Sequence, residues 1–448
     1  MLQNTAERAS GASPAPAQAA PAGTVSTGRA WYTVLLLSLL YVVSQVDRSI
    51  LALLAEPVSK ALGIDDRQMA LLLGLGFALL YAFGGIILGH FVDTRNRRVV
   101  ATCGIVLWSA ATITSAFATD YWTLLLLRSG VALGEAVLMP TAISLIADLF
   151  PPERRGLPVA AFTSIGSSMT FGSYIFGGAA VSLAGALAPG SHMAVWQLSL
   201  IIVGIPGLAL ALIFALSAAV PPHRHAIVPD TPELSIGAML AHFRSRGRFL
   251  GPLLSLTGLN CIYGLAIAIW LPTVLIREHG VSAATAGYLV GSFGVPSALI
   301  GNFFWQGVAT RMQRNDPLRG NLRAFIVPAL VVAPLNAGGL LTHNMWIQLA
   351  GFGIGTFFST GFNVLTPLSV QYYVPAGLRA RMVTVNFLLI SVLGYALGPW
   401  AAVELGLLLS HGPDSLRLGL AAGAAITWPV LIIATLVAIR NVDGPAAQ

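Results

Sequence analysis

Long apolar runs separated by short polar segments dominate this chain. Each run holds the roughly 20 mainly apolar residues that a helix needs to cross a bilayer, so we expect twelve transmembrane helices. Most of the segments between them are short, which makes consecutive helices antiparallel neighbours. The runs are residues 31–55, 68–92, 99–118, 121–149, 157–185, 194–219, 249–276, 283–309, 324–342, 345–373, 382–410 and 414–440.

One longer polar segment, residues 220–248, divides the twelve runs into two sets of six. The pattern predicts an N-terminal six-helix bundle over 29–219 and a C-terminal bundle over 249–440. Within the linker, Thr231 and Pro232 are typical of a helix start, which predicts a short interfacial helix. Residues 1–28 are rich in Ala, Pro, Gly, Ser and Thr and are expected to form a disordered tail rather than a signal peptide. Residues 441–448 form a second tail.

Composition supports an integral membrane protein. Of the 448 residues, 56% are hydrophobic and 9% charged, against roughly 25% charged in soluble domains. The net charge of +7 does not indicate a nucleic-acid-binding surface, because the basic residues lie in short loops instead of on one soluble face. Cys103 and Cys261 fall inside apolar runs and read as core residues rather than a disulfide.

The distribution of basic residues predicts the orientation. Eighteen of the 24 Lys and Arg residues lie on the side of the termini, four lie on the opposite side and two lie within spans. The positive-inside rule therefore places both termini in the cytoplasm. Nearly all the basic residues are Arg and no organellar presequence is recognisable, which favours a bacterial inner membrane.

The loop after the second span carries the motif Gly89-His90-Phe91-Val92-Asp93-Thr94-Arg95-Asn96-Arg97-Arg98. It resembles the signature of the major facilitator superfamily, although Thr94 replaces a basic residue and Asn96 replaces a glycine; Asn tolerates the left-handed conformation. A plain positively charged loop would explain the arginines but not Gly89 and Asp93.

This motif predicts a cytoplasmic gate. Gly89 would allow close helix approach, Asp93 would lie against a helix N-terminus, and the arginines would lie against carbonyl ends. The gate is expected to comprise Gly89, Asp93, Arg97, Arg98, Asp148, Arg154 and Arg155. The second half has only a degenerate echo at Gly307, Arg311 and Arg314, so the gate should be asymmetric.

Four ionisable residues lie inside spans. Asp47 and Arg48 are in the first span, and Arg128 and Glu135 are in the fourth. Such groups are costly in a bilayer and normally face a wet cavity with a partner. Arg128 and Glu135 are seven residues apart, on one helical face and roughly 10 Å apart. Asp47 and Arg128 both lie roughly 10–14 Å below the outer surface by counting 1.5 Å per residue, so they match in depth as a pair.

In the superfamily, the first and fourth spans line the central cavity, so the resemblance places these four residues around one wet space. A carboxylate whose arginine partner can be withdrawn changes its affinity for a proton with conformation. Glu135, with no base within a turn on its own helix, is the better candidate for a group protonated in one state. The alternative is an ion pair that only fixes helix packing.

The second half offers uncharged polar residues instead. Spans seven, eight and ten hold no charged residue within their cores, so one cavity wall is expected to be charged and the other amide and aromatic. That arrangement would suit a substrate with a polar head and a long apolar body. The alternative is that these amides hold helices together. The candidates are Asn260, Tyr263, Trp270, Asn302, Asn363 and Asn386.

A further resemblance is to the spinster branch of the superfamily. It rests on Asp47-Arg48 together with Arg128, Glu135-Ala136, Pro140-Thr141 and Asp148-Leu149-Phe150. The resemblance implies a rocker-switch transporter of lysolipid- or sphingolipid-like molecules. It also implies that Asp47 and Glu135 are the proton-linked acids, with Arg48 and Arg128 as their partners or as head-group ligands.

The sequence leaves a second transport function open. A major-facilitator exporter of drugs or importer of small organic anions is the alternative within the superfamily. An enzyme is not indicated, because His90, His343 and His411 are scattered at loop edges without metal-ligand spacing. We therefore expect no cofactor and no metal, and as partners an amphipathic substrate, protons and the lipid bilayer, with the protein acting as a monomer.

Overall fold

The computed structural model describes residues 25–221, 236–316 and 319–442. Within these ranges every regular element is a helix. Most of the tails expected over 1–28 and 441–448, and the helix start expected at Thr231 and Pro232, lie outside the described residues.

We call helices α1 to α9 the first group, and they correspond to the first six expected spans. Residues Ala55–Leu62 and Asp66–Ala70 add two short helices after the first span. The bounds are α1 Thr27–Leu53, α2 Ala55–Leu62, α3 Asp66–Ala70, η1 Leu71–Leu75, α4 Gly76–Thr94, α5 Arg97–Ser115, α6 Tyr121–Glu135, α7 Leu138–Leu149, η2 Pro152–Arg154, α8 Gly156–Leu187, η3 Ala188–Gly190 and α9 Val195–Ser217.

The second group, α10 to α17, holds the other six spans. Its first helix is 44 residues long and is kinked at Arg246, whose φ of −116° and ψ of 19° are not helical. The bounds are α10 Ile236–His279, α11 Ala283–Asn315, α12 Gly320–Arg323, α13 Ile326–Leu340, α14 Met345–Tyr373, α15 Ala376–Leu389, η5 Ile390–Leu397, α16 Gly398–Leu409 and α17 Ser415–Arg440.

The expected set of twelve spans agrees with this fold. In the described residues, 11 helical segments are long and apolar enough to cross a membrane. The tenth expected span is α14, which has 29 residues and so is also long enough. It is less apolar than the others because glycines, serines and threonines occupy much of its length.

Polar side chains fix where several helices begin. Asp65 and Gln68 form a capping box at the start of α3, and the side chain of Asp120 accepts hydrogen bonds from the backbone N–H groups of Trp122 and Thr123 at the start of α6. Asn96 does the same for α5, with a φ of −66°. The left-handed conformation considered for Asn96 is therefore not adopted, because its side chain serves as an N-cap.

The fourth span is broken where a single helix was expected. Helix α6 ends at Glu135 and α7 begins at Leu138. Pro140 has no backbone N–H, so it cannot donate to the carbonyl of Ala136 four residues earlier. The break places the Glu135 side chain at a helix end inside the membrane span.

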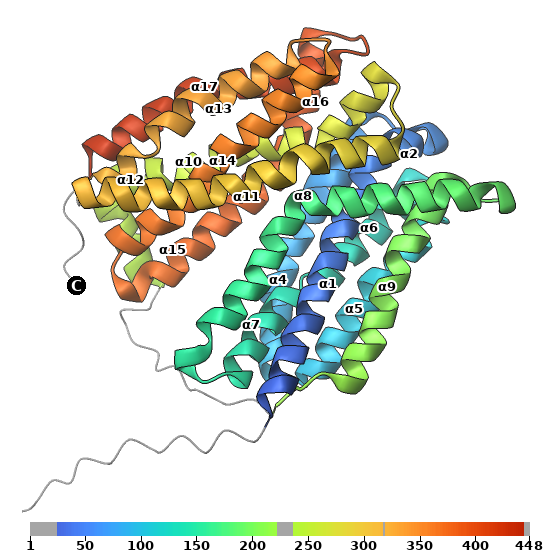
Figure 1. The fold of residues 1–448 in the computed structure, drawn as a ribbon, viewed down its shortest axis with the longest axis horizontal. Helices are drawn as coiled ribbons and strands as arrows, with labels where there is room; N and C mark the ends of the chain where they lie inside the picture. Colours follow the sequence, from blue (N-terminus) through green and yellow to red (C-terminus); the bar gives the residue numbers. More distant parts are fainter. Residues whose placement is uncertain (1–24, 222–235, 317–318, 443–448) are drawn as a thin grey trace, which may run out of the picture.

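The two groups lie together on one side and diverge on the other (Figure 1). We call the side where α1 begins the terminal side, and the opposite side the distal side. Small residues allow close contact between the groups at two crossings. A Cβ added at Gly287 in α11 would lie 2.7 Å from the carbonyl oxygen of Tyr174 in α8. A Cβ added at Gly74 in η1 would lie 2.7 Å from the carbonyl oxygen of Tyr395 in η5.

Candidate functional site

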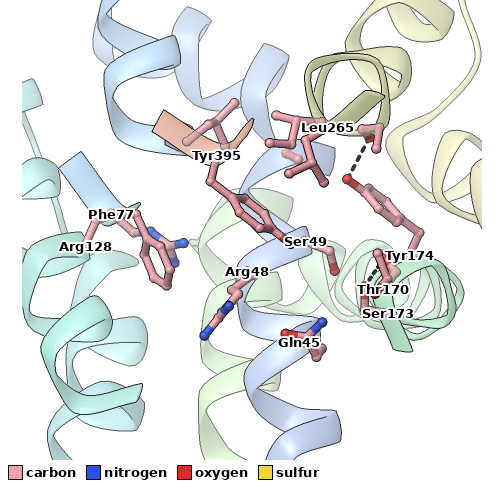
Figure 2. A pocket seen from close by; sticks show the side chains of 14 residues that line it. Gln45, Arg48, Ser49, Phe77, Arg128, Thr170, Ser173, Tyr174, Leu265 and Tyr395 are labelled. Atoms are coloured by element: carbon pink, nitrogen blue, oxygen red, sulfur yellow. Dashed lines mark hydrogen bonds between the residues drawn. The ribbon is translucent and has the colours of Figure 1, made fainter. Parts of the chain in front are cut away.

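A cavity lies between the two groups near the middle of the spans. It holds about 620 Å³ of empty space and is lined by residues of α1, η1, α4, α6, α8, α10 and η5. Figure 2 shows Arg48 on α1 and Tyr395, which comes from the second group, lining the same cavity. Arg128 and Phe77 line another part of the same cavity (Figure 2). The cavity therefore has two arginines on the wall formed by the first group.

The four ionisable residues of the first and fourth spans form two crossed ion pairs. The Nη1 atom of Arg128 donates to Oδ1 of Asp47 at 3.1 Å, as depth matching predicts. The Nε atom of Arg48 donates to Oε2 of Glu135 at 2.6 Å. Each acid is thus paired with a base from the other helix, because neighbours on a helix point about 100° apart.

These groups are deeply buried but not fully satisfied. Asp47 and Glu135 are each 1% exposed, and the hydroxyl of Thr112 in α5 donates to the second oxygen of Asp47. The Oε1 atom of Glu135 and the Nε atom of Arg128 are buried without a hydrogen-bond partner in the described residues. A buried polar atom left unpaired costs about 1–3 kcal/mol.

Aromatic rings hold the arginines on the cavity wall. The guanidinium carbon of Arg48 lies 4.2 Å from the ring centre of Tyr81 and 5.1 Å from that of Phe77. The guanidinium carbon of Arg128 lies 5.6 Å from the ring centre of Phe77. Such cation–π contacts stabilise each cation by roughly 0.5–2 kcal/mol. Arg48 is the more accessible cation, with 21% of its side chain exposed.

A second compartment continues from this cavity into the second group. It holds about 560 Å³ of empty space and shares Thr170, Leu265 and Ala268 with the first. Asn260 and Asn363, two of the cavity candidates, line it. The amide of Asn260 donates to the hydroxyl of Ser359 at 2.9 Å.

The other four cavity candidates line neither compartment. Trp270 is fully buried and its ring N–H donates to the carbonyl of Pro399 at 3.1 Å, so it holds α10 against α16. The hydroxyl of Tyr263 donates to Asn260 at 3.3 Å, which makes Tyr263 a support for a lining residue. Asn302 and Asn386 are on α11 and α15 and do not reach the cavity surface.

Three of the expected gate residues make their contacts inside the first group and do not reach the second group. Arg97 pairs with Asp148 at 2.6 Å. Arg98 donates to the carbonyl oxygens of Ala215 and Ala218 at the end of α9, at 2.6 and 2.8 Å, which agrees with the expectation that arginines contact carbonyl ends. Arg155 donates to the carbonyl oxygen of Phe150 at 3.0 Å.

Two expected gate contacts are not present in this conformation. A Cβ added at Gly89 would meet only Pro140, at 3.9 Å, so no close helix approach occurs there. Asp93 is exposed at the end of α4 instead of lying against a helix N-terminus, and Arg154 is also exposed. The reason is that the two groups diverge on the terminal side, which leaves these side chains facing open space.

The second group repeats part of this pattern, with an uncharged pair in place of one ion pair. Arg379 donates to the carbonyl oxygen of Val374, five residues earlier, at 2.9 Å, as Arg155 does to Phe150. At the place corresponding to the pair of Arg97 and Asp148, the amide of Asn321 donates to the hydroxyl of Ser369 at 2.7 Å. The ion pair described at this end of the second group is instead that of Arg323 with Asp316, at 2.9 Å.

The ion pairs described between the two groups lie on the distal side. Arg277 of α10 contacts Glu56 at 2.6 Å and Asp66 at 2.7 Å, and Arg67 of α3 contacts Glu404 of α16 at 2.7 Å. Burial raises the pKa of Glu56, but hydrogen bonds and charge from Arg277 and Lys60 outweigh it, so the pKa lies below its ordinary value. These pairs hold the distal side closed.

Sequence reasoning missed several residues of the site. Thr112, Tyr81 and Tyr395 were not candidates, although a polar or aromatic side chain inside a span is a weak signal of a cavity. Arg277 was counted only for orientation. Its position at the end of a span, opposite the acid-containing segment 56–66, was the available signal for a distal contact.

Comparisons with known proteins fit this geometry. The sequence model of the Major Facilitator Superfamily matches residues 37–399. An MFS-type efflux pump of Mycolicibacterium smegmatis is 24% identical over 91% of this chain and 90% of that protein. Protein spinster homolog 1 of Homo sapiens is 27% identical over 60% of this chain and 50% of that protein. A sphingosine-1-phosphate transporter of Mus musculus is 34% identical over 28% of this chain and 23% of that protein.

The chain thus spans about half the length, or less, of the human and mouse relatives. Among solved structures, a bacterial homolog of the human lysosomal transporter Spinster, in an inward-facing and unoccupied conformation, superposes with a TM-score of 0.79. It is 21% identical and the match covers 94% of this chain and 100% of that chain. The chain therefore belongs to the major facilitator superfamily of membrane transporters, and it resembles the spinster branch.

Proposed function

We propose that this protein is a proton-coupled secondary transporter of anionic, single-chain amphipathic lipids, of the lysolipid or sphingolipid type. The observation that carries the proposal is the pair of crossed ion pairs on the cavity wall, in which each acid depends on a base from another helix. Moving α1 relative to α6 would break both pairs at once, so protonation and conformation are linked.

Arg48 is proposed as the head-group ligand. It is the more exposed of the two arginines, it lines the cavity, and Arg128 remains engaged with Asp47. An anionic head that takes the Arg48 guanidinium leaves Glu135 buried without a partner. An unpaired buried carboxylate is stable only in its protonated form, so anion binding and proton binding at Glu135 should favour each other. Asp47 is proposed as the second proton-linked acid.

The apolar part of the cavity supports a lipid substrate. Phe77, Leu265 and Ile269 line the first compartment beside the arginines, and an acyl chain lying on them would leave water. Sphingosine-1-phosphate, named for the mouse relative, combines an anionic head with one long chain. A substrate of that kind would place its head at Arg48 and its chain along the aliphatic surface.

The terminal side is proposed to be cytoplasmic, in a bacterial inner membrane, because basic residues are concentrated there. This conformation is then open to the inside and closed by the ion pairs of Arg277 and Arg67 on the outside. The exposed Asp93 and Arg154, with Gly89, would form their gate contacts only when the terminal side closes. The two groups are proposed to be domains of a monomeric rocker switch.

An alternative is the export of drugs, which the efflux pump of Mycolicibacterium smegmatis favours because it matches this chain over 90% of its own length. Import of small organic anions would also use the two arginines. Thermal stabilisation of the purified protein discriminates among these. Stabilisation by short carboxylates or cationic drugs, without stabilisation by lysolipids, would favour the alternatives.

Transport by reconstituted protein tests the proposal. Liposomes containing the protein should move a fluorescent lysophospholipid faster when a pH gradient is imposed, and Arg48→Gln should abolish the movement. Asp47→Asn and Glu135→Gln should each remove the dependence on the gradient. Asn302→Leu, a substitution outside both compartments, serves as the matched control. Transport by the wild-type protein at a rate that does not depend on the pH gradient would contradict proton coupling.

A further inference from the structure

The second compartment is lined by hydrogen-bonding groups that face its empty space. Asn336 of α13 is 6% exposed and Thr356 of α14 is 8% exposed, and both line this empty space. In the described part of the chain, neither side chain has a hydrogen-bond partner. A neutral polar group that faces an empty compartment is free to form a hydrogen bond with a ligand. Their retention is explained if a ligand satisfies them.

Local packing directs the Asn336 amide rather than leaving it free to turn. A Cβ added at Gly355 in α14 would overlap Oδ1 of Asn336, so only glycine leaves room for this amide. On the other side of the compartment, Asn260 and Ser359 form a mutual pair, with contacts of 2.9 and 3.2 Å. The compartment therefore presents prearranged donors and acceptors from three helices.

The chemistry of this wall is neutral. None of the described residues that line the second compartment is Asp, Glu, Lys, Arg or His. An ammonium group would find no carboxylate here, and an anion would find no base. Amides and hydroxyls, which both donate and accept, instead match hydroxyl or amide groups on a ligand.

One molecule would be able to occupy both compartments. They share Thr170, Leu265 and Ala268, and residues 352 to 363 of α14 extend the second compartment by roughly 16 Å at 1.5 Å per residue. Such a ligand would carry its anion at Arg48 and its neutral polar groups at Asn336 and Thr356.

We propose that the second compartment is a subsite for an uncharged polyhydroxy group attached to the anion of the substrate. The inference rests on the proposed function, because it assigns a second part of the head group to the same site. Polyhydroxy anions come from two sources, a lysolipid with a polyol head or a free sugar acid.

Binding to purified full-length protein tests the subsite. The probes are lysophosphatidylglycerol, lysophosphatidic acid with the same acyl chain, and gluconate. Wild type should bind lysophosphatidylglycerol about tenfold more tightly than lysophosphatidic acid, as expected for one or two hydrogen bonds. Asn336→Leu and Thr356→Val should each remove most of this preference and leave the affinity for lysophosphatidic acid unchanged. Asn302→Leu, the matched control outside both compartments, should retain the preference.

The outcomes separate the subsite from the proposed function. Equal affinities of wild type for the two lysolipids, or an unchanged preference in both subsite variants, would overturn the subsite while lipid transport stands. Binding of gluconate that depends on Asn336 and Thr356, without lysolipid binding, would keep the subsite and overturn the lipid substrate. If Asn336→Leu does not fold, the smaller change Thr356→Val decides the question alone.

Discussion

Arg48 and Glu135 are joined by an Nε to Oε2 contact of 2.6 Å between the first and fourth spans. Asp47, the residue before Arg48, binds Arg128 of the same fourth span. Each of the two helices therefore supplies the acid of one pair and the base of the other. A displacement of α1 along α6 would weaken both, so the relative position of these two helices and the two ion pairs depend on each other.

Thr112 should position Asp47. Its hydroxyl donates to the carboxylate oxygen that Arg128 does not contact, so Thr112→Val leaves that oxygen unsatisfied. We expect a loss of about 1–3 kcal/mol in the free energy of unfolding and a shifted pH profile of transport. Thr112→Ser should restore both, measured by thermal unfolding and by liposome transport. A valine variant with an unaltered pH profile would show that the hydroxyl has no part in the proton linkage.

Arg277 should contribute more than Arg67 to closing the distal side. Arg277 holds two acids with one-fifth of its side chain exposed, whereas the side chain of Arg67 is 55% exposed and holds one acid. Solvent screens exposed pairs, which therefore contribute little, while partly buried hydrogen bonds between charged groups contribute more. Arg277→Ala should raise the population with an open distal side, and Arg67→Ala should change it little.

Spin labels can measure this population. Ala61 and Leu408 are exposed on the distal side of the two groups, and Cys103 and Cys261 are the only cysteines to replace first. Electron–electron distance distributions between labels at 61 and 408 should broaden toward longer values in Arg277→Ala. An equal response of the two alanine variants would contradict the ranking.

Acid should open the distal side through Glu56. The pKa of Glu56 is lowered in the closed arrangement, so its contribution to closure is complete above its ordinary value of 4.5 and is lost as pH falls through the lowered pKa. The label distance should stay constant from pH 7 to about pH 5 and lengthen below that range. Glu56→Gln should remove much of the change. Lengthening that begins near pH 6.5 would implicate another group.

Gly74 should be required where the two groups cross. A Cβ at this position would lie 2.7 Å from the backbone carbonyl of Tyr395, which cannot move like a flexible side chain. Overpacking of this kind costs about 1–3 kcal/mol, so Gly74→Ala should lower the thermal stability and slow transport. Gly338→Ala is the matched control, because a Cβ there meets nothing within 4 Å. Equal effects of the two substitutions would show that the crossing is not tight.

The sequence alone predicted most of the fold because membrane spans are long and apolar. The sequence also predicted the pairing of Asp47 with Arg128, because the depth of each residue in the bilayer can be estimated by counting residues from the outer end of its helix. It did not predict the partners of Arg277, which lie 221 and 211 residues away. Segments so far apart in the sequence come into contact only when the two groups of helices pack together.

Which face of a span meets the cavity was harder to predict. Trp270 and Asn336 both carry hydrogen-bonding groups within apolar runs. Trp270 donates a hydrogen bond to the backbone of Pro399, whereas Asn336 lines the second compartment. The difference follows from helix rotation, which packing of neighbouring helices decides. The gate at Gly89 and Asp93 depends in addition on conformation, because its contacts need the terminal side to close.

Proton uptake on ligand binding tests the central claim most directly. Anionic lysolipid is added to purified protein in weakly buffered solution at neutral pH, and a pH indicator records the change. Wild type should take up protons in proportion to the bound lipid, because Arg48 leaves Glu135, and Glu135→Gln should bind lipid with much less uptake. Lipid binding by wild type without proton uptake, or with uptake equal to that of Glu135→Gln, would contradict the account.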